Sequence, residues 1–175
     1  TWARCSKCEY EKRDSSGGNL APRSIQSMLN SQGETVYFLS SHGWQAYGSL
    51  ESFYGVRNPS DLSEKIRPTV NLINYAYSRY ANSIRLGNRY ECLVPYGSAT
   101  TNNLNFVFNR DFGAWTIYDN YPFSDICVFR DTKGIDQVYM SSSIEPKIYK
   151  RNTGFTDNTF GYSRDIITKT FTQGV

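Results

Sequence analysis

Short runs of β-branched and aromatic residues, each bounded by turn-forming residues, constrain the fold of this chain more than any other feature. Four such runs follow one another at residues 83–87, 88–97, 102–109 and 114–119. The joints between them are rich in Gly, Asn and Asp, which tolerate the backbone conformations of tight turns. This order predicts a four-stranded antiparallel meander.

The same order of four runs can be placed both before and after this meander. These earlier and later runs lie at residues 23–29, 34–40, 44–48, 53–56, 124–131, 135–142, 146–152 and within 164–171. Tyr37, Tyr90 and Tyr139 each fall in the second run of a set, in what we interpret as matching places, so the sets repeat with a loose period of about 50 residues. Four strands per repeat of this length are typical of β-propeller blades, which bury their faces by stacking around an axis.

We therefore expect an all-β fold of about three propeller blades, near residues 21–57, 79–120 and 123–172. Together they would form a single propeller fragment over residues 1–175, with 1–20 as an outer strand or a linker. The aromatic share of 15% favours strands over helices. Because propellers typically have about four to eight blades, a longer polypeptide or several protomers would have to complete the ring. The architectural alternative is a β-sandwich of about twelve strands.

One segment, near residues 59–76, departs from the strand pattern and predicts a short kinked helix inserted between blades. Residues 58–61 resemble a helix cap, and Pro68 is expected to interrupt the helix. The apolar residues at helical spacing are Leu62, Ile66, Val70 and Ile73. We expect this helix to cover an exposed sheet face, and contact with a neighbouring subunit is the alternative.

Charge and hydropathy limit the classes of function. The chain has 19 basic and 16 acidic residues, and the net charge of +3 is spread along it, which does not support a dedicated nucleic-acid footprint. No apolar run approaches the roughly 18 residues of a membrane-spanning helix, and the first residues lack the apolar core of a signal peptide. The start at Thr1 without methionine suggests a fragment or a processed product. Four cysteines are too few for a disulfide scaffold and favour a reducing compartment.

Cysteine and histidine offer few candidates for chemistry. Cys5 and Cys8 have the CxxC spacing of half a zinc site or a redox pair, but no second close pair of ligands follows, so loop or strand residues are the simpler interpretation. Cys92 and Cys127 lie within apolar runs and are expected to be small buried side chains. His42 is the only histidine, and its position in a Ser-Ser-His-Gly turn favours a solvent-facing residue over a base. We assign no catalytic residue, metal or cofactor.

Residues 109–116, Asn-Arg-Asp-Phe-Gly-Ala-Trp-Thr, resemble the Asp-box of sialidases and related propellers, Ser-x-Asp-x-Gly-x-Thr-Trp. Asn replaces Ser here and the final pair is inverted, but the stretch falls between the third and fourth expected strands, as in that family. Asp111 is expected to accept backbone N–H bonds, Gly113 to take a positive φ, and Trp115 to fill the space between sheets. We interpret this turn as a marker of the fold, because no motif places the family's catalytic arginines, tyrosine and acid.

Three longer stretches are similar to blades of bacteriophage tail proteins. In residues 21–49, an Ala-Pro-Arg-Ser-Ile segment leads to a strand ending in Phe-Leu-Ser and then to a Gly-rich turn with a tyrosine. Residues 88–120 resemble the family's blade that begins Asn-Arg-Tyr and ends near Trp-Thr, and residues 137–158 resemble its closing Asn-Thr-Gly-x-Thr-Asp segment. The similarity covers about residues 20–160 and departs from the family at both ends. The chain thus resembles the propeller of nozzle, hub or tail-stabilisation proteins of short-tailed phages.

This resemblance implies a structural function in the virion tail after assembly in the host cytoplasm. Such proteins form a ring below the portal and adaptor, extend the channel through which the genome leaves, and help to retain packaged DNA. The implied partners are copies of the chain itself, other tail or portal-adaptor proteins, and passing genomic DNA bound without sequence specificity. The resemblance implies no enzyme activity, no cofactor, no small-molecule substrate and no membrane insertion.

A glycan-binding or glycan-cleaving propeller, sialidase-like or lectin-like, is the main functional alternative. The Asp-box-like turn favours it, together with Trp44, Tyr96 and Tyr121, which we expect at the surface, where aromatic rings could stack on sugars. A general interaction propeller is a further alternative, disfavoured because no Gly-His…Trp-Asp signature is present.

Overall fold

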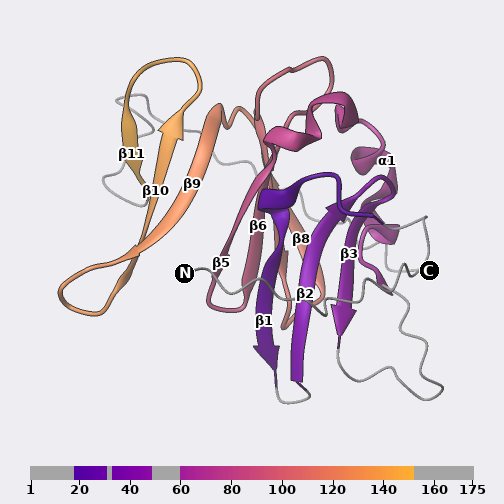
Figure 1. Ribbon diagram of the computed structural model, residues 1–175, viewed down its shortest axis with the longest axis horizontal. Helices are drawn as coiled ribbons and strands as arrows, with labels where there is room; N and C mark the ends of the chain where they lie inside the picture. The colour runs from indigo at the N-terminus through magenta and orange to yellow at the C-terminus, as the bar shows by residue number, and fades with distance from the viewer. Residues whose placement is uncertain (1–17, 31–32, 49–59, 152–175) are drawn as a thin grey trace, which may run out of the picture.

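The computed structural model of the chain describes residues 18–30, 33–48 and 60–151 (Figure 1). These residues form three antiparallel sheets, each built from strands that are consecutive in the sequence. The all-β fold expected from the sequence is therefore confirmed. None of the described helices has the length and apolar character needed to cross a membrane.

The first sheet has the strand order β1-β2-β3-β4. Its strands are β1 (Gln26–Asn30), β2 (Gly33–Ser40), β3 (Gly43–Gly48) and β4 (Ser60–Asp61). The strand predicted at residues 53–56 lies outside the described residues. The fourth strand of this sheet is the short β4, which pairs with β3 through Gln45 and Ala46.

The second sheet is the four-stranded meander predicted from the sequence, in the order β5-β6-β7-β8. Its strands are β5 (Asn82–Leu86), β6 (Arg89–Val94), β7 (Leu104–Asn109) and β8 (Ala114–Tyr118). Gly87 and Gly113, in the first and last turns, both have φ of 58°. A side chain is strained in this left-handed region, which explains why glycine stands at both turns.

The third sheet has the order β11-β10-β9. Its strands are β9 (Phe123–Arg130), β10 (Asp136–Ser142) and β11 (Ile148–Lys150). The last predicted strand, within residues 164–171, lies outside the described residues. All three described sheets are therefore meanders, and their strands fall near the runs of β-branched and aromatic residues found in the sequence.

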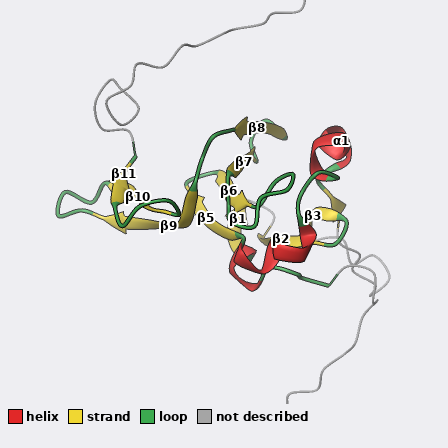
Figure 2. Ribbon diagram, turned by 90° about the horizontal axis from the view of Figure 1, so that it is seen from above, coloured by secondary structure: helices red, strands yellow, loops and turns green. Residues whose placement is uncertain are grey.

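The second sheet lies between the other two: one face packs against the first sheet, and the other face packs against the third sheet at β5 and β6. The first core, between the first and second sheets, contains Met28, Tyr37, Leu39, Trp44, Ala46, Tyr90, Cys92, Val94, Leu104, Phe106 and Phe108. The second core, between the second and third sheets, contains Ile84, Leu93, Ile126, Val138 and Met140. Strand β5 contacts both β1 and β9, and Figure 2 shows the three sheets spreading away from these first strands.

The tyrosines that suggested the repeat do not occupy equivalent places. Tyr37 points from the first sheet toward the second, whereas Tyr90 points from the second sheet back toward the first, and their rings stack in the first core with centroids 5.8 Å apart. Tyr139 lies between Val138 and Met140, which face the second core, so strand alternation turns Tyr139 to the opposite, outer face. The interpretation as matching places was wrong, because a shift of one residue within a strand moves a side chain to the other face.

The segment predicted as one kinked helix consists of short pieces instead. These pieces are η2 (Glu64–Ile66), α1 (Arg67–Val70) and η3 (Tyr75–Tyr80), and a further short helix, η1 (Pro22–Ser24), precedes β1. The expected cap at residues 58–61 was wrong, because Ser60 and Asp61 form β4. Pro68 lies in the first turn of α1 rather than interrupting a helix, a position where its missing N–H has no intrahelical partner to lose.

The inserted segment covers one end of the first sheet rather than a sheet face. Val70 and Ile73 are buried in the first core, and Leu62 and Ile66 pack against it. Gly43, at the start of β3, lies directly beneath this segment. A Cβ atom at Gly43 would lie 2.5 Å from Ser63 Oγ and 2.9 Å from Val70 Cγ1, so the absence of a side chain permits the close approach.

Candidate functional site

The Asp-box-like stretch forms the turn between β7 and β8. The backbone N–H of Asp111 donates to Oδ1 of Asn109 at 3.0 Å, so Asn109 closes the turn through its side chain. The Asp111 carboxylate accepts a hydrogen bond from the Asn88 side-chain amide at 2.7 Å. Asn109, rather than Asp111 as expected, therefore accepts the backbone N–H bond within this turn. Asp111 instead links this turn to the turn between β5 and β6.

Trp115 follows this turn and joins the first two sheets. Its ring centroid lies 5.0 Å from the ring of Trp44 on β3 and 5.0 Å from that of Phe108 on β7. Its Nε1–H donates to the carbonyl of Leu62 at 2.9 Å, which satisfies the indole donor at the edge of the core. The residue fills the space between sheets as the turn motif predicts.

The three aromatic residues expected at the surface do not form an exposed platform. Trp44 has no exposed surface and lies 4.4 Å from the ring of Phe106, so its prediction as a surface contact was wrong. The reason is strand alternation, which turns Trp44 and Ala46 into the first core. Tyr96 is half-buried against the same core and is held by its backbone N–H, which donates to Asn103 Oδ1 at 2.8 Å.

Tyr121 packs against the second core rather than projecting into solvent. Its ring meets that of Phe123 edge-on, with centroids 4.7 Å apart. Burial raises the pKa of Tyr121, and the nearby positive charge of Arg151 opposes this effect. The hydroxyl lies 2.8 Å from the sulfur of Met140. Tyr121 therefore contributes to sheet packing.

The two described cysteines differ in burial. Cys92 is buried in the first core, and burial raises the pKa of its thiol to about 12. Cys127 is exposed, so its prediction as a buried residue was wrong. Ile126 is buried in the second core with Val128 packed against that core, so the intervening Cys127 points to the outer face of the third sheet. Cys5 and Cys8 lie outside the described residues.

His42 is exposed in the turn between β2 and β3, as the sequence predicts. Its Nδ1 lies 3.0 Å from the Ser41 hydroxyl, and its carbonyl accepts a hydrogen bond from Arg67 of the inserted segment. Within residues 18–30, 33–48 and 60–151, no cluster of three or more His, Cys, Asp or Glu residues could hold a metal ion.

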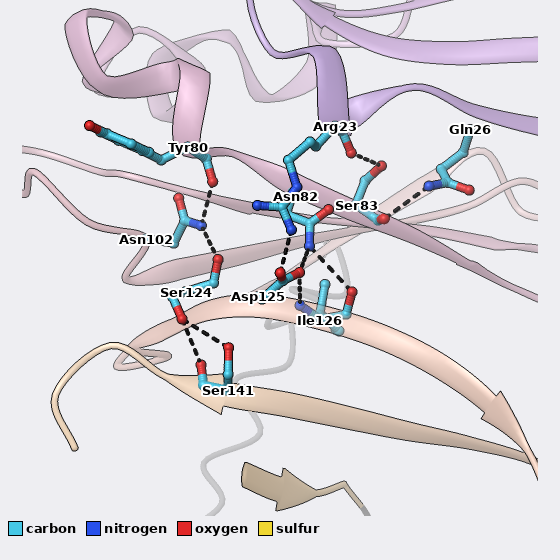
Figure 3. A network of polar contacts seen from close by, with 10 residues as sticks. All are labelled: Arg23, Gln26, Tyr80, Asn82, Ser83, Asn102, Ser124, Asp125, Ile126 and Ser141. Carbon is cyan, nitrogen blue, oxygen red and sulfur yellow. Dashed lines mark hydrogen bonds and ion pairs between the residues drawn. The ribbon is translucent and has the colours of Figure 1, made fainter. Parts of the chain in front are cut away.

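A polar network that the sequence did not indicate joins the three sheets where their first strands meet (Figure 3). Asp125 of β9 forms an ion pair with Arg23, which precedes β1, and accepts a hydrogen bond from the side-chain amide of Asn82 on β5. The same amide also donates to the carbonyl of Ile126 at 3.3 Å. We call Arg23, Asn82 and Asp125 the three-sheet junction.

Further bonds extend this network along the first strands. The Ser83 hydroxyl donates to the carbonyl of Arg23 at 3.1 Å, and the Gln26 amide donates to the carbonyl of Ser83 at 2.9 Å. Asn102 donates to the carbonyls of Tyr80 and Ser124. The Arg23 and Asp125 side chains are 54% and 46% exposed, so their ion pair fixes geometry more than it stabilises the fold.

A buried ion pair fastens the second sheet to the third. Glu91 lies on β6 with its side chain only 2% exposed, and Arg151, which follows β11, holds it with both terminal nitrogens. The second of these bonds, from Nη2 to Oε1, measures 3.0 Å. Asn105 also donates to the Glu91 carboxylate, at 3.4 Å. A single acidic residue inside the apolar run Tyr-Glu-Cys-Leu-Val was the available sequence signal, but nothing local identified its partner.

The outer face of the third sheet carries apolar side chains without a neighbouring sheet among the described residues. Phe129 on β9 is 63% exposed and Ile148 on β11 is 75% exposed. Cys127 and Tyr139 are cross-strand partners between them. Isolated exposed apolar residues are ordinary, but a group on one sheet face indicates a contact surface.

No protein-family model, curated protein or solved structure matches this chain. The resemblance to phage tail propellers therefore stays a prediction, and it rests on the residues of the chain and on how its sheets are arranged.

Proposed function

We propose that the three sheets are successive blades of a β-propeller and that the chain is a structural component of the tail of a short-tailed bacteriophage, of the nozzle or hub type. In this role copies form a ring that extends the DNA exit channel and helps to retain the packaged genome. The chain acts through assembly, with tail or portal-adaptor proteins as its neighbours.

The observation that supports this proposal most is the three-sheet junction. Arg23, Asn82 and Asp125 come from the beginnings of three sheets and bind one another, so the sheets meet at their first strands. Propeller blades meet in this way around their axis. A two-layer sandwich would contain two facing sheets rather than a series of three whose first strands adjoin.

The packing suits a part that must stay rigid while DNA passes. The second sheet is braced to the first through aromatic rings, with Trp44, Phe106 and Trp115 within 6.2 Å of one another by centroid. It is braced to the third through the second core and through the Glu91–Arg151 ion pair. Interfaces of this density resist deformation.

Assembly of the purified chain tests this function. The chain should bind the portal or adaptor protein encoded in the same genome and form rings visible by electron microscopy. A strictly monomeric chain without affinity for either protein would contradict the proposal.

The glycan-binding alternative stays a prediction supported by the turn at residues 109–116. A glycan array and a panel of fluorogenic glycosides distinguish the two functions. Binding or cleavage in either assay, without portal or adaptor binding, would favour the alternative.

A further inference from the structure

We propose that the outer face of the third sheet binds the outer face of the first sheet of a second copy, so that copies continue the stack of sheets head to tail. This inference rests on the proposed ring-forming function and identifies the surfaces that would form the ring.

The two interfaces between sheets follow one another in the same order as the sheets do in the sequence, first to second and second to third. Tyr37 and Leu39 of the first sheet point toward the second sheet. There they pack against the face that carries Tyr90 and Phe106. The second sheet turns its other face, with Leu93, toward the third sheet. The second sheet therefore gives one face to the first sheet and the opposite face to the third. Among residues 18–30, 33–48 and 60–151, no further sheet covers the other face of the first sheet or of the third, and we call these two the unused faces.

The unused face of the third sheet carries apolar side chains on each of its three strands, beside the polar Gln137 and Lys150. Phe129 and Cys127 lie on β9, Tyr139 lies on β10 and Ile148 lies on β11. Cys127 is the register partner of Tyr139, and Ile148 alternates with Tyr149, which packs against the second core. These four side chains therefore share the outer face, and Phe129 and Ile148 are among its most exposed apolar groups.

The unused face of the first sheet also carries apolar side chains, beside the exposed Glu34. Leu29 on β1 is 73% exposed. Val36 and Tyr47 are register partners that alternate with the core residues Tyr37 and Ala46, and both are half-buried. The two end faces thus combine aliphatic and aromatic side chains, as the two faces of the first core do.

The order of the sheets within the chain indicates that a second copy, placed by its first sheet, binds the outer face of the third sheet. Strand β5 contacts β1 on one side and β9 on the other, so first strands follow one another through the junction. A second copy that continues this order places its β1 beside β9. If the third sheets of two copies faced each other instead, the order of sheets in the second copy would run opposite to the order in the first. Because a contact between two different surfaces repeats indefinitely, it generates a closed ring or a filament.

A charge placed on the third-sheet face tests the contact. Phe129→Asp should shift the 175-residue chain to monomer in sedimentation velocity, while Phe112→Asp, at an 80% exposed phenylalanine in the turn between β7 and β8, should leave the oligomer unchanged. Circular dichroism of both variants establishes that they are folded. An unchanged oligomer for folded Phe129→Asp, or a wild-type chain that is monomeric at all concentrations, would overturn the proposal.

Cross-linking tests the sense of the contact. In a Cys5→Ser, Cys8→Ser background, Leu29→Cys should join Cys127 of another copy through a short bismaleimide and produce a ladder of dimers and larger species. The same background without Leu29→Cys should produce none. Dimers formed through Cys127 alone would reveal two third sheets face to face, and that result would overturn the head-to-tail arrangement.

The outcome separates this inference from the proposed function. If the chain cross-links head to tail but binds no portal or adaptor protein, this result supports the inferred contact between copies and contradicts the tail function. A chain that binds the portal or adaptor but fails both the sedimentation and the cross-linking tests contradicts the inference alone.

Discussion

Glu91 shows how one buried residue connects two sheets. Its carboxylate lies on the middle sheet, its cation comes from the third sheet, and both are held away from water. A buried ion pair contributes little net stability over an apolar pair of similar shape, but the loss of one partner leaves an uncompensated charge. Single substitutions at this pair should therefore be costly.

Arg151→Met should lower the free energy of unfolding by about 3 kcal/mol, because Glu91 would remain buried without its cation. Urea denaturation measures this change. Arg130→Met is the matched control, since its ion pair with Asp136 has an arginine side chain that is 70% exposed. An equal loss of stability in the two variants would show that the Glu91–Arg151 pair is not buried as described.

Cys92 and Cys127 should differ in reactivity. The pKa of Cys92, raised to about 12 by burial, keeps it a neutral thiol at pH 8, while the exposed Cys127 should be alkylated readily by iodoacetamide. Mass mapping of the peptides measures the two sites separately. Rapid labelling of Cys92 in the folded chain would contradict its burial.

The sign of the pH effect follows from the same shift in pKa. The folded chain holds the Cys92 thiol neutral, so its contribution to stability is complete below the ordinary thiol pKa of 9.0 and decreases as pH rises toward about 12. Burial also raises the pKa of Tyr90, which shares the first core. Alkaline unfolding is therefore expected.

At the scale of elements, the strands were predictable and the faces of their side chains were not. Runs of β-branched and aromatic residues bounded by turn-forming residues indicated β2, β6, β7 and β10, because such residues favour strands. Cys127 and Trp44 were assigned to the wrong face because the face depends on register, which the composition of one strand does not determine. The inserted segment was mistaken for one helix because packing on the sheet, rather than helical spacing, sets its conformation.

The candidate site was less predictable than the strands. The Asp-box-like turn was recognisable because its residues lie close together in the sequence. Arg23 and Asp125 are 102 residues apart, and Glu91 and Arg151 are 60 residues apart. No sequence pattern identifies partners that lie so far apart in the chain. These contacts become visible only in the three-dimensional arrangement of the sheets.

Gly43→Ala should destabilise the chain more than Gly113→Ala. Both glycines have positive φ, but a Cβ at Gly43 would meet Ser63 and Val70 at 3.0 Å or less, whereas nothing lies within 4 Å of one at Gly113. Strain alone should cost roughly 1–2 kcal/mol at Gly113, and displacement of the inserted segment should add to it at Gly43. Thermal unfolding compares the variants, and equal melting temperatures would contradict the close docking of this segment.

At the scale of the whole molecule, the account depends on three sheets that meet at their first strands and leave an apolar face at each end. The two cores and the polar junction make these sheets one packed unit. We propose that the unit continues into a further sheet at its exposed end faces. The head-to-tail contact between copies requires this continuation.

An electron cryomicroscopy reconstruction of the particle that the chain forms tests this claim most directly. The account predicts that a further sheet covers Phe129 and Ile148 and that the first strands of all sheets surround one axis. A reconstruction in which the outer face of the third sheet stays in solvent, or in which the first strands do not share an axis, would contradict it.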